Sequence, residues 1–193
     1  MSMGQLDELI FYKTGAMSFH NKNILREVVT EILTAATSCT WLGRWRMISV
    51  TDSNRRVRVV EVWQDGLRKI GRLKDADFIE RWKLAPLFIA FCHPKNFEPF
   101  GWVPAEYARV YSIQEIGTAV RSLELKALEH GISLHGIMGM LLPEICSGVN
   151  AELAIPETQE LVFFGVMGYP NETVEQKFPK IEDVCYFEGW KQR

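Results

Sequence analysis

The stretch "GTAVRSLELKALEHGISLHGIMG", Gly117 to Gly139, carries the strongest structural signal in this chain. Apolar residues within it and just before it recur at three- and four-residue steps, as in a helix: Ile113, Ile116, Ala119, Val120, Leu123, Ala127 and Leu128. Leu125 widens the apolar surface, which predicts a helix that is enclosed on more than one side. Gly131 stands where a C-terminal glycine would end this helix. We interpret the following "GISLHG" as a turn that exposes backbone N–H groups.

Segments on either side of this helix predict further elements. "NILREVVTEILTAAT" has one apolar face at helical spacing, with Asn23 as its expected N-cap. Strands are predicted at Met47–Val50, at Leu161–Met167, and at Leu87–Cys92, whose unbroken apolar run is typical of a strand covered on both faces. Val57–Arg72 is compatible with either a strand or a helix. The order of elements indicates a mixed α/β domain with a sheet between helices.

The composition is that of an ordinary globular protein. The chain has 193 residues, of which 47% are hydrophobic and 24% charged, so we expect a single domain over residues 1–193. The net charge of −2 leaves no electrostatic footprint for nucleic acid. No apolar run approaches the roughly 20 residues that cross a bilayer. The acidic start "MSMGQLDELIFYK" does not resemble a secretory signal, so we expect a cytoplasmic protein without membrane contact.

Four cysteines are spread along the chain: Cys39, Cys92, Cys146 and Cys185. None is spaced as C-x-x-C or placed beside a histidine at ligand spacing, so we predict no metal site and expect reduced thiols. No pattern in the sequence indicates a catalytic nucleophile or general base.

The segment "HPKNFEPFGWVP" is the least regular part of the chain, and we interpret residues 93–105 as a candidate lid over a substrate. Phe100 and Trp102 are its candidate substrate contacts, although both are equally compatible with burial against a partner chain. The C-terminal tail, residues 171–193, is partly amphipathic and is a candidate for contact with a neighbouring subunit.

Five segments, in this order, resemble the nitroreductase family of FMN-dependent flavoproteins. They are "NILREVVTEILTAAT", "WRMISVTD", "LAPLFIAF", "QEIGTAVRSLELKALEHGIS" and "AIPETQELVFFGVMGYP". The resemblance spans about Phe11 to Tyr186, and "GYP" after a buried strand is its most specific element.

This resemblance implies an α+β fold, a three-layer α-β-α sandwich, that forms an obligate-type homodimer. It also implies FMN at the dimer interface, held by both subunits, with NADH or NADPH as the electron donor. The electrons would pass to a small electron-poor acceptor of the nitro-compound or quinone type. A flat flavin would then lie near "GISLHG", where backbone is exposed at the end of the long helix.

The first FMN motif of the family, Arg-Arg-Ser-x-Arg before a Phe, corresponds to "KTGAMSF", Lys13 to Phe19. Lys13 keeps a positive charge, whereas Thr14, Gly15 and Met17 stand where Arg, Ser and Arg would be. A phosphate dianion favours charge-assisted donors, ideally bidentate arginine. One lysine is a weaker clamp, to which Thr14 and the backbone of Gly15 can add donors. Lys13 is equally compatible with a solvated surface position.

The second motif, Ala-Pro-Ser-x-x-Asn-x-Gln-Pro-Trp, corresponds to "ATSCTWLGRW". Ala36, Ser38 and Trp45 match it; Trp41, Gly43 and Arg44 replace Asn, Gln and Pro. Trp41 either stacks on the flavin or, like Trp45, packs in the core or dimer. Arg44 offers its charge either to the cofactor, where it would stabilise reduced flavin, or to an interface salt bridge. Ser38 is either a flavin contact or a helix-end hydroxyl.

The remaining candidates follow the long helix and the last strand. Lys177 and Lys180 are alternative phosphate contacts after "GYP", and the choice between them stays open. His135 and Gly136 lie in "GISLHG", where backbone N–H groups can meet a flavin. His135 is either a partly buried structural residue or a proton donor.

Three functional hypotheses result, of which the third is a divergent enzyme that consumes or sequesters flavin instead of cycling it. The first is an FMN-binding oxidoreductase that uses a nicotinamide donor and a small-molecule acceptor. The second is a divergent dimer of the same fold, with a lost or altered flavin site, that acts as a binding or structural protein. The altered FMN motifs favour the second hypothesis, and the five ordered segments favour the first.

Overall fold

The computed structural model describes residues 16–38, 43–97, 101–172 and 179–185. The elements, in chain order, are α2 (Arg26–Thr37), β1 (Arg46–Val50), α3 (Ser53–Lys69), α4 (Leu73–Phe78), the 3-10 helix η1 (Ile79–Leu84), β2 (Leu87–Pro94), α5 (Ala105–Glu129), β3 (Ser133–Gly136), the 3-10 helix η2 (Met138–Leu141), α6 (Pro143–Glu152), β4 (Gln159–Gly168) and α7 (Ile181–Val184). Among the described residues, no helix combines the length and apolarity that a membrane span requires.

A four-stranded sheet lies at the centre, with the order β1-β2-β4-β3 and antiparallel pairing throughout. The middle strand β2 is buried from Leu87 to His93. Its side chains alternate between two cores: Leu87, Ile89 and Phe91 enter one, and Phe88, Ala90 and Cys92 enter the other. Burying each large apolar side chain contributes about 1.5–3 kcal/mol. The prediction of a strand covered on both faces is therefore confirmed.

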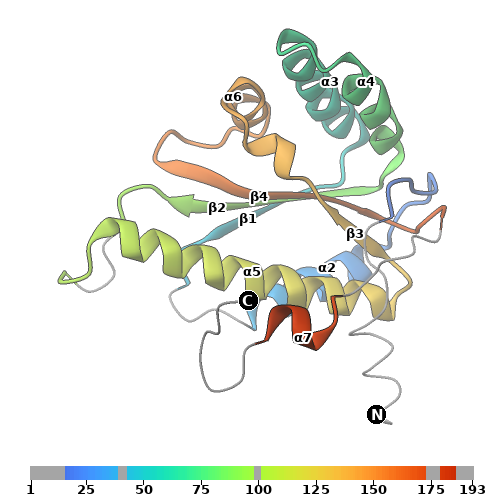
Figure 1. The fold of residues 1–193 in the computed structure, drawn as a ribbon. Helices are drawn as coiled ribbons and strands as arrows, with labels where there is room; N and C mark the ends of the chain where they lie inside the picture. The colour runs from blue at the N-terminus through green and yellow to red at the C-terminus, as the bar shows by residue number, and fades with distance from the viewer. Residues whose placement is uncertain (1–15, 39–42, 98–100, 173–178, 186–193) are drawn as a thin grey trace.

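Helices cover both faces of this sheet (Figure 1). On one face, α2 and α5 pack against each other and over the first core. On the other face, α3 and α6 pack together, with α4 and η1 beside α3. The result is three layers, α-β-α, as expected.

The ambiguous segment at Val57–Arg72 belongs to helix α3. Asp52 caps the helix, because its carboxylate accepts a hydrogen bond from the Arg55 N–H at 2.8 Å. Val59, Val60, Trp63 and Leu67 then form one buried stripe at helical spacing. This tertiary burial overrides the strand preference of the β-branched residues.

Helix α2 begins later than predicted. Its N-cap is Leu25, which provides no side-chain capping bond, and Asn23 lies two residues earlier. The expected N-cap was therefore wrong, while the helix and its buried face, Val29, Ile32 and Ala36, are confirmed.

The long helix α5 ends as predicted. Gly131 has φ +68°, the Ile132 N–H donates to the Ala127 carbonyl at 3.0 Å, and the Gly131 N–H donates to the Leu128 carbonyl at 3.0 Å. The residues after it, however, form strand β3, so "GISLHG" is not the expected turn. Pairing with β4 supplies the backbone partners that make this short stretch a strand.

Only one stripe of α5 is fully buried within the described residues: Ala108, Ser112, Ile116, Ala119, Leu123 and Ala127. On the opposite side, Tyr107, Val110 and Tyr111 are about half exposed. The expectation of a helix enclosed on more than one side is thus not met by the described residues of one chain.

Candidate functional site

The predicted site residues fall into three sets in space. Lys13, Thr14, Gly15, Trp41, Phe100 and Lys177 lie outside the described residues. Met17, His135 and Gly136 lie toward the end of β4, where β3 pairs with it. Ser38, Gly43, Arg44 and Trp102 lie toward the other end of the sheet, where β1 and β4 begin. Lys180 is the N-cap residue of the short helix α7.

The segment that carries Met17 is attached to the chain just after β4. Phe19 forms an isolated bridge with Pro170, and the His20 N–H donates to the Tyr169 carbonyl at 3.0 Å. The Asn171 N–H donates to the Ser18 carbonyl at 3.1 Å. This pairing puts residues 16–19, the described part of the first FMN-like motif, at the end of β4 that also contacts β3.

Trp82, in η1, links this segment to β3. Its indole N–H donates to the Met17 carbonyl at 2.9 Å, and its ring centroid lies 5.3 Å from that of His135. The ring also stacks on Trp63 at 4.8 Å and meets the edge of Phe78 at 5.8 Å. Sequence reasoning missed Trp82, because "ERWKLAP" only indicates a helix before a proline. We call Met17, Trp82, His135, Gly136 and Glu172 the β3-end group.

Glu172 completes the β3-end group. Its carboxylate Oε1 accepts a hydrogen bond from the Met17 N–H at 2.6 Å. Both backbone polar groups of Met17 are therefore bonded within the chain, the N–H to Glu172 and the carbonyl to Trp82. The Met17 side chain is 41% exposed.

His135 and Gly136 lie on an edge strand, since β3 pairs with β4 alone in the described sheet. His135 is half-buried and Gly136 is exposed. A Cβ atom at Gly136 would stand 3.1 Å from the Phe163 ring, which leaves little room for a larger residue on that side. The backbone here is accessible to a ligand or to another chain.

At the other end of the sheet we define a β1-end group: Ser38, Gly43, Arg44, Phe97 and Glu115. The Gly43 N–H donates to Glu115 Oε1 at 3.4 Å, and the Arg44 guanidinium lies 5.3 Å from the centroid of the Phe97 ring. The Ser38 hydroxyl donates to the Ala35 carbonyl of its own helix at 2.7 Å.

The two tryptophans near the β1-end group differ in exposure. Trp45 is buried and packs on Phe91, with ring centroids 5.3 Å apart, which matches the core-packing alternative. Trp102, by contrast, is 81% exposed. It therefore presents an aromatic surface close to the start of α5.

Charged groups surround a buried histidine beside the β1-end group. Arg109 of α5 forms a bidentate ion pair with Glu160, with N–O distances of 2.9 and 2.6 Å. This hydrogen-bonded pair holds the pKa of Glu160 below its usual value. His93, opposite Glu160 in the sheet, is 1% exposed, and burial lowers its pKa.

Cys92 and Cys146 lack the properties of a nucleophile. Burial, with a smaller contribution from Cys146, raises the pKa of Cys92 to about 11. Burial also raises the pKa of Cys146. In the described part of the chain, no three His, Cys, Asp or Glu side chains gather as a metal site requires.

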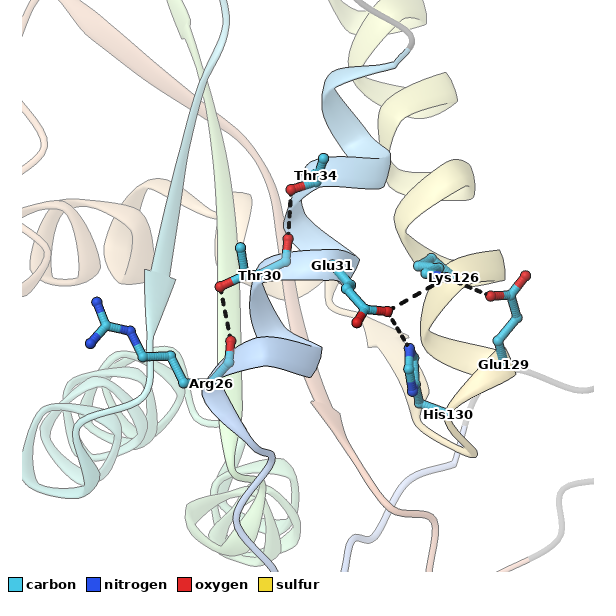
Figure 2. Close-up of polar contacts among 7 residues, drawn as sticks. All are labelled: Arg26, Thr30, Glu31, Thr34, Lys126, Glu129 and His130. Carbon is cyan, nitrogen blue, oxygen red and sulfur yellow. Dashed lines mark hydrogen bonds and ion pairs between the residues drawn. The ribbon is translucent and has the colours of Figure 1, made fainter.

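A shallow groove of about 500 Å³ lies between α2 and α5, lined by Thr30, Glu31, Thr34, Ala35 and Lys126. Figure 2 shows that the Thr30 and Thr34 hydroxyls turn back to the carbonyls one turn earlier, at 2.9 and 2.7 Å. Glu31 reaches across to Lys126 at 3.6 Å and His130 at 3.1 Å. The two contacts of Glu31 hold the middle of α2 against the end of α5.

The β3-end and β1-end groups lie far apart in one chain. His135 pairs with Val166 of β4, whereas Arg46, at the start of β1, pairs with Cys92 and through it with Leu161. Five residues of extended strand separate Leu161 from Val166, which is about 17 Å. The two groups therefore cannot contact the same face of one small ring system within a single chain.

No protein-family model matches this chain, and no curated protein matches its sequence. Solved structures, however, share its fold. An FMN-dependent nitroreductase from Clostridium difficile R20291 is 19% identical, with a TM-score of 0.67 over 97% of this chain and 99% of the other. NfrA2 of B. megaterium is 19% identical, with a TM-score of 0.77 over 98% and 76%. A nitroreductase-like family protein from Bacillus cereus is 17% identical, with a TM-score of 0.75 over 95% and 96%.

These identities are all below 20%, so the likeness concerns the fold. The chain has the nitroreductase fold, and the predicted three-layer architecture is confirmed.

Proposed function

We propose that this chain is an FMN-binding oxidoreductase that acts as a homodimer. It takes electrons from NADH or NADPH and passes them to a small electron-poor acceptor, such as a nitro compound or a quinone. The likeness to a protein described as an FMN-dependent nitroreductase, over nearly the whole of both chains, supports this proposal.

The observation that carries the proposal is the separation of the two candidate groups. The described residues of the first FMN-like motif lie toward the β3 end of the sheet and those of the second toward the β1 end. The β4 positions that mark these two ends, Val166 and Leu161, are about 17 Å apart. A flavin held by both subunits needs this division. In a two-fold dimer, the β3-end group of one copy can face the β1-end group of the other.

The outer face of α5 supplies a surface for the second copy. Tyr107, Val110 and Tyr111 are between 49% and 56% exposed there. Gly117 is exposed on the same helix, and no atom lies within 4 Å of the position of a Cβ. Exposed aromatic residues with a glycine for close approach are the features that a packed helix interface uses.

The described residues fit the ring of a flavin better than its phosphate. The accessible edge strand with His135 and Gly136 offers backbone groups to a flat ring. At the first motif, the Met17 N–H holds the Glu172 carboxylate, which is unfavourable for a phosphate at the same donor. Arg44 of the second copy would supply a positive charge beside the ring. A bound flavin would supply the hydride and electron chemistry, and the chain would supply position and charge.

The experiment that tests the proposal begins with the purified full-length protein. We expect a yellow protein that releases FMN on heat denaturation and whose bound flavin is bleached anaerobically by NADH or NADPH. A colourless protein that also fails to quench the fluorescence of added FMN would remove the proposal. Bound FMN that neither nicotinamide reduces would require another electron donor.

A surface variant tests the dimer independently. In an isolated chain, Gly117→Arg replaces an exposed mid-helix glycine and should not harm folding. If a second copy packs on α5, the same change should convert dimer to monomer in sedimentation analysis. Ala151→Arg, at an exposed position of α6 on the opposite face, is the matched control and should leave the dimer intact.

The second candidate function is a dimer that binds or supports another molecule without redox chemistry. The contact of Glu172 with Met17 favours this alternative, because it puts a negative charge at the first motif. The absence of flavin uptake together with an intact dimer would favour it over the oxidoreductase.

A further inference from the structure

Glu172 reaches back to the segment that carries the first FMN-like motif. Its Oε1 accepts from the Met17 N–H at 2.6 Å, a short contact between a backbone donor and a carboxylate. Residue 169 pairs with residue 20, and residue 171 pairs with residue 18. The same antiparallel pairing brings Glu172 directly opposite Met17. The position of this carboxylate is therefore set by backbone pairing.

The rest of the β3-end group holds Met17 from the other side. The Trp82 indole N–H donates to the Met17 carbonyl at 2.9 Å, and Trp82 is 4% exposed. Since Trp82 also packs on Trp63 and His135, this anchor is rigid. The Met17 N–H cannot easily turn away from Glu172 toward another acceptor.

A backbone N–H at this motif is the kind of donor that a phosphate group uses. A carboxylate on the same N–H competes for the donor and repels a phosphate dianion. An uncharged ribityl hydroxyl suffers no such repulsion and can donate a hydrogen bond to the carboxylate.

We propose that Glu172 determines flavin specificity: it weakens the phosphate contact, so that this site binds riboflavin about as tightly as FMN. This inference rests on the proposed flavin site and adds a residue that selects the form of the ligand. It also explains how the site tolerates Thr14, Gly15 and Met17 where the family has Arg, Ser and Arg, because an uncharged ligand end does not need those cations.

The test compares the two flavins on three proteins: the wild type, Glu172→Gln and Glu157→Gln. Glutamine is isosteric and its Oε1 can still accept from the Met17 N–H, so the fold is preserved. Glu157 is an exposed carboxylate in the turn before β4, at the other end of the sheet, and its variant controls for the loss of one negative charge. Dissociation constants come from quenching of flavin fluorescence.

We expect Glu172→Gln to bind FMN about tenfold more tightly than the wild type, which corresponds to removing a like charge about 4 Å away in well-solvated, high-dielectric surroundings. Riboflavin affinity should change less than twofold, and Glu157→Gln should match the wild type for both flavins. The tenfold gain should shrink in high salt, because Glu172 is exposed.

Two results would overturn the inference, and they differ in what they say about the flavin site. If the wild type and Glu172→Gln bind FMN equally, or if riboflavin affinity rises as much as FMN affinity, Glu172 does not select against phosphate although the flavin site stands. If no variant binds either flavin, the proposed function fails and the inference fails with it.

Discussion

The two ends of the central sheet differ in how many of their polar atoms have a hydrogen-bond partner within the chain. At the β3 end, both backbone groups of Met17 are bonded by side chains from distant segments, at 2.6 and 2.9 Å. At the β1 end, four buried side-chain atoms outside Glu115 have no hydrogen-bond partner among the residues that the structure describes: Trp45 Nε1, His93 Nδ1, Ser112 Oγ and Gln159 Oε1. Beside the β3-end group there are two such atoms, Trp63 Nε1 and Arg56 Nε.

This difference indicates at which end of the sheet a single chain leaves more buried polar atoms without a hydrogen-bond partner. A buried polar atom without a partner destabilises a fold by about 1–3 kcal/mol, so such atoms are normally satisfied by water or by another molecule. At the β3 end, both backbone groups of Met17 are bonded within its own chain. The β1 end, where Arg44 and Trp102 also lie, is the end that we expect a second copy or bound water to complete.

Variants of Trp82 should have the largest effect on stability. Trp82→Leu removes the stacking and the hydrogen bond together, and should lower the free energy of unfolding by about 3–5 kcal/mol. Trp82→Phe retains an aromatic ring and removes the bond to Met17. Trp63→Phe is its control, because the Trp63 indole nitrogen is buried without a hydrogen-bond partner in the described part of the chain.

In urea unfolding, Trp82→Phe should therefore be less stable than Trp63→Phe by about 1 kcal/mol. Equal losses in the two variants would mean that the bond to Met17 does not hold the β3 end.

The ends of α5, before β3, and of α6, before β4, differ in which residue has the left-handed backbone conformation (positive φ). Gly131, before β3, has φ +68°, and Ala154, before β4, has φ +54°. Both ends have the same pair of backbone hydrogen bonds, which for α6 join Ile155 to Asn150 and Ala154 to Ala151. Gly131→Ala should lower stability by about 1–2 kcal/mol, because no atom hinders the new methyl group and only the backbone conformation is unfavourable.

Ala154→Gly should raise stability, by about 0.5–1 kcal/mol, because glycine removes the same strain. Thermal unfolding of both variants measures the pair. A stabilised Gly131→Ala protein would contradict the assigned helix end.

At acidic pH, protonation of His93 at the β1 end should lower the stability of the folded protein. Burial lowers its pKa in the folded protein, while Glu160 raises it and Arg109 lowers it by smaller amounts. The unfolded chain therefore binds the proton first as pH falls below about 6.5, and stability falls from there toward the lower folded pKa. For this one group, the free energy of unfolding changes by at most about 1.4 kcal/mol per pH unit.

His93→Gln should flatten the pH dependence between pH 7.5 and 5.5, as measured by urea unfolding at each pH. Glu160, whose pKa is lowered, contributes only in more acidic solution, around and below its usual pKa of 4.5. An unchanged slope in the variant would assign the acid sensitivity to another group.

The variant with the smallest expected effect removes one of the buried polar atoms at the β1 end that have no hydrogen-bond partner among the described residues. Ser112 is fully buried on α5. Because we expect water or the second copy to bond its hydroxyl, Ser112→Ala should lower the melting temperature by about 2–4 °C, equivalent to about 1 kcal/mol. A higher melting temperature would show that this hydroxyl has no partner in the dimer either.

The parts of the fold that could be predicted from sequence are those with local or unbroken patterns. The apolar run Leu87–Cys92 and the spacing in α2 and α5 sufficed, and Gly131 ended α5 where expected. Two elements were not predictable in this way. β3 has four residues and owes its conformation to pairing with a strand about 30 residues away. The β-branched residues of α3 favour a strand until the buried stripe and the Asp52 cap are seen.

The candidate site was less predictable than the fold, because its contacts join distant segments. Trp82 matters through Met17 and His135, which lie 65 and 53 residues away in sequence. Glu172 likewise meets Met17 across 155 residues. Motif resemblance pointed to Met17, His135 and Gly136, but nothing in their spacing indicated the two side chains that connect them.

Sedimentation velocity of the wild-type protein, followed at the visible absorption band of the flavin, tests the central claim most directly. We predict that the yellow colour sediments with a species of twice the 22.2 kDa mass of one chain and that Gly117→Arg loses both the dimer and the colour. Flavin that sediments with a single chain, or a dimer that takes up no flavin, would contradict a cofactor site shared by two copies.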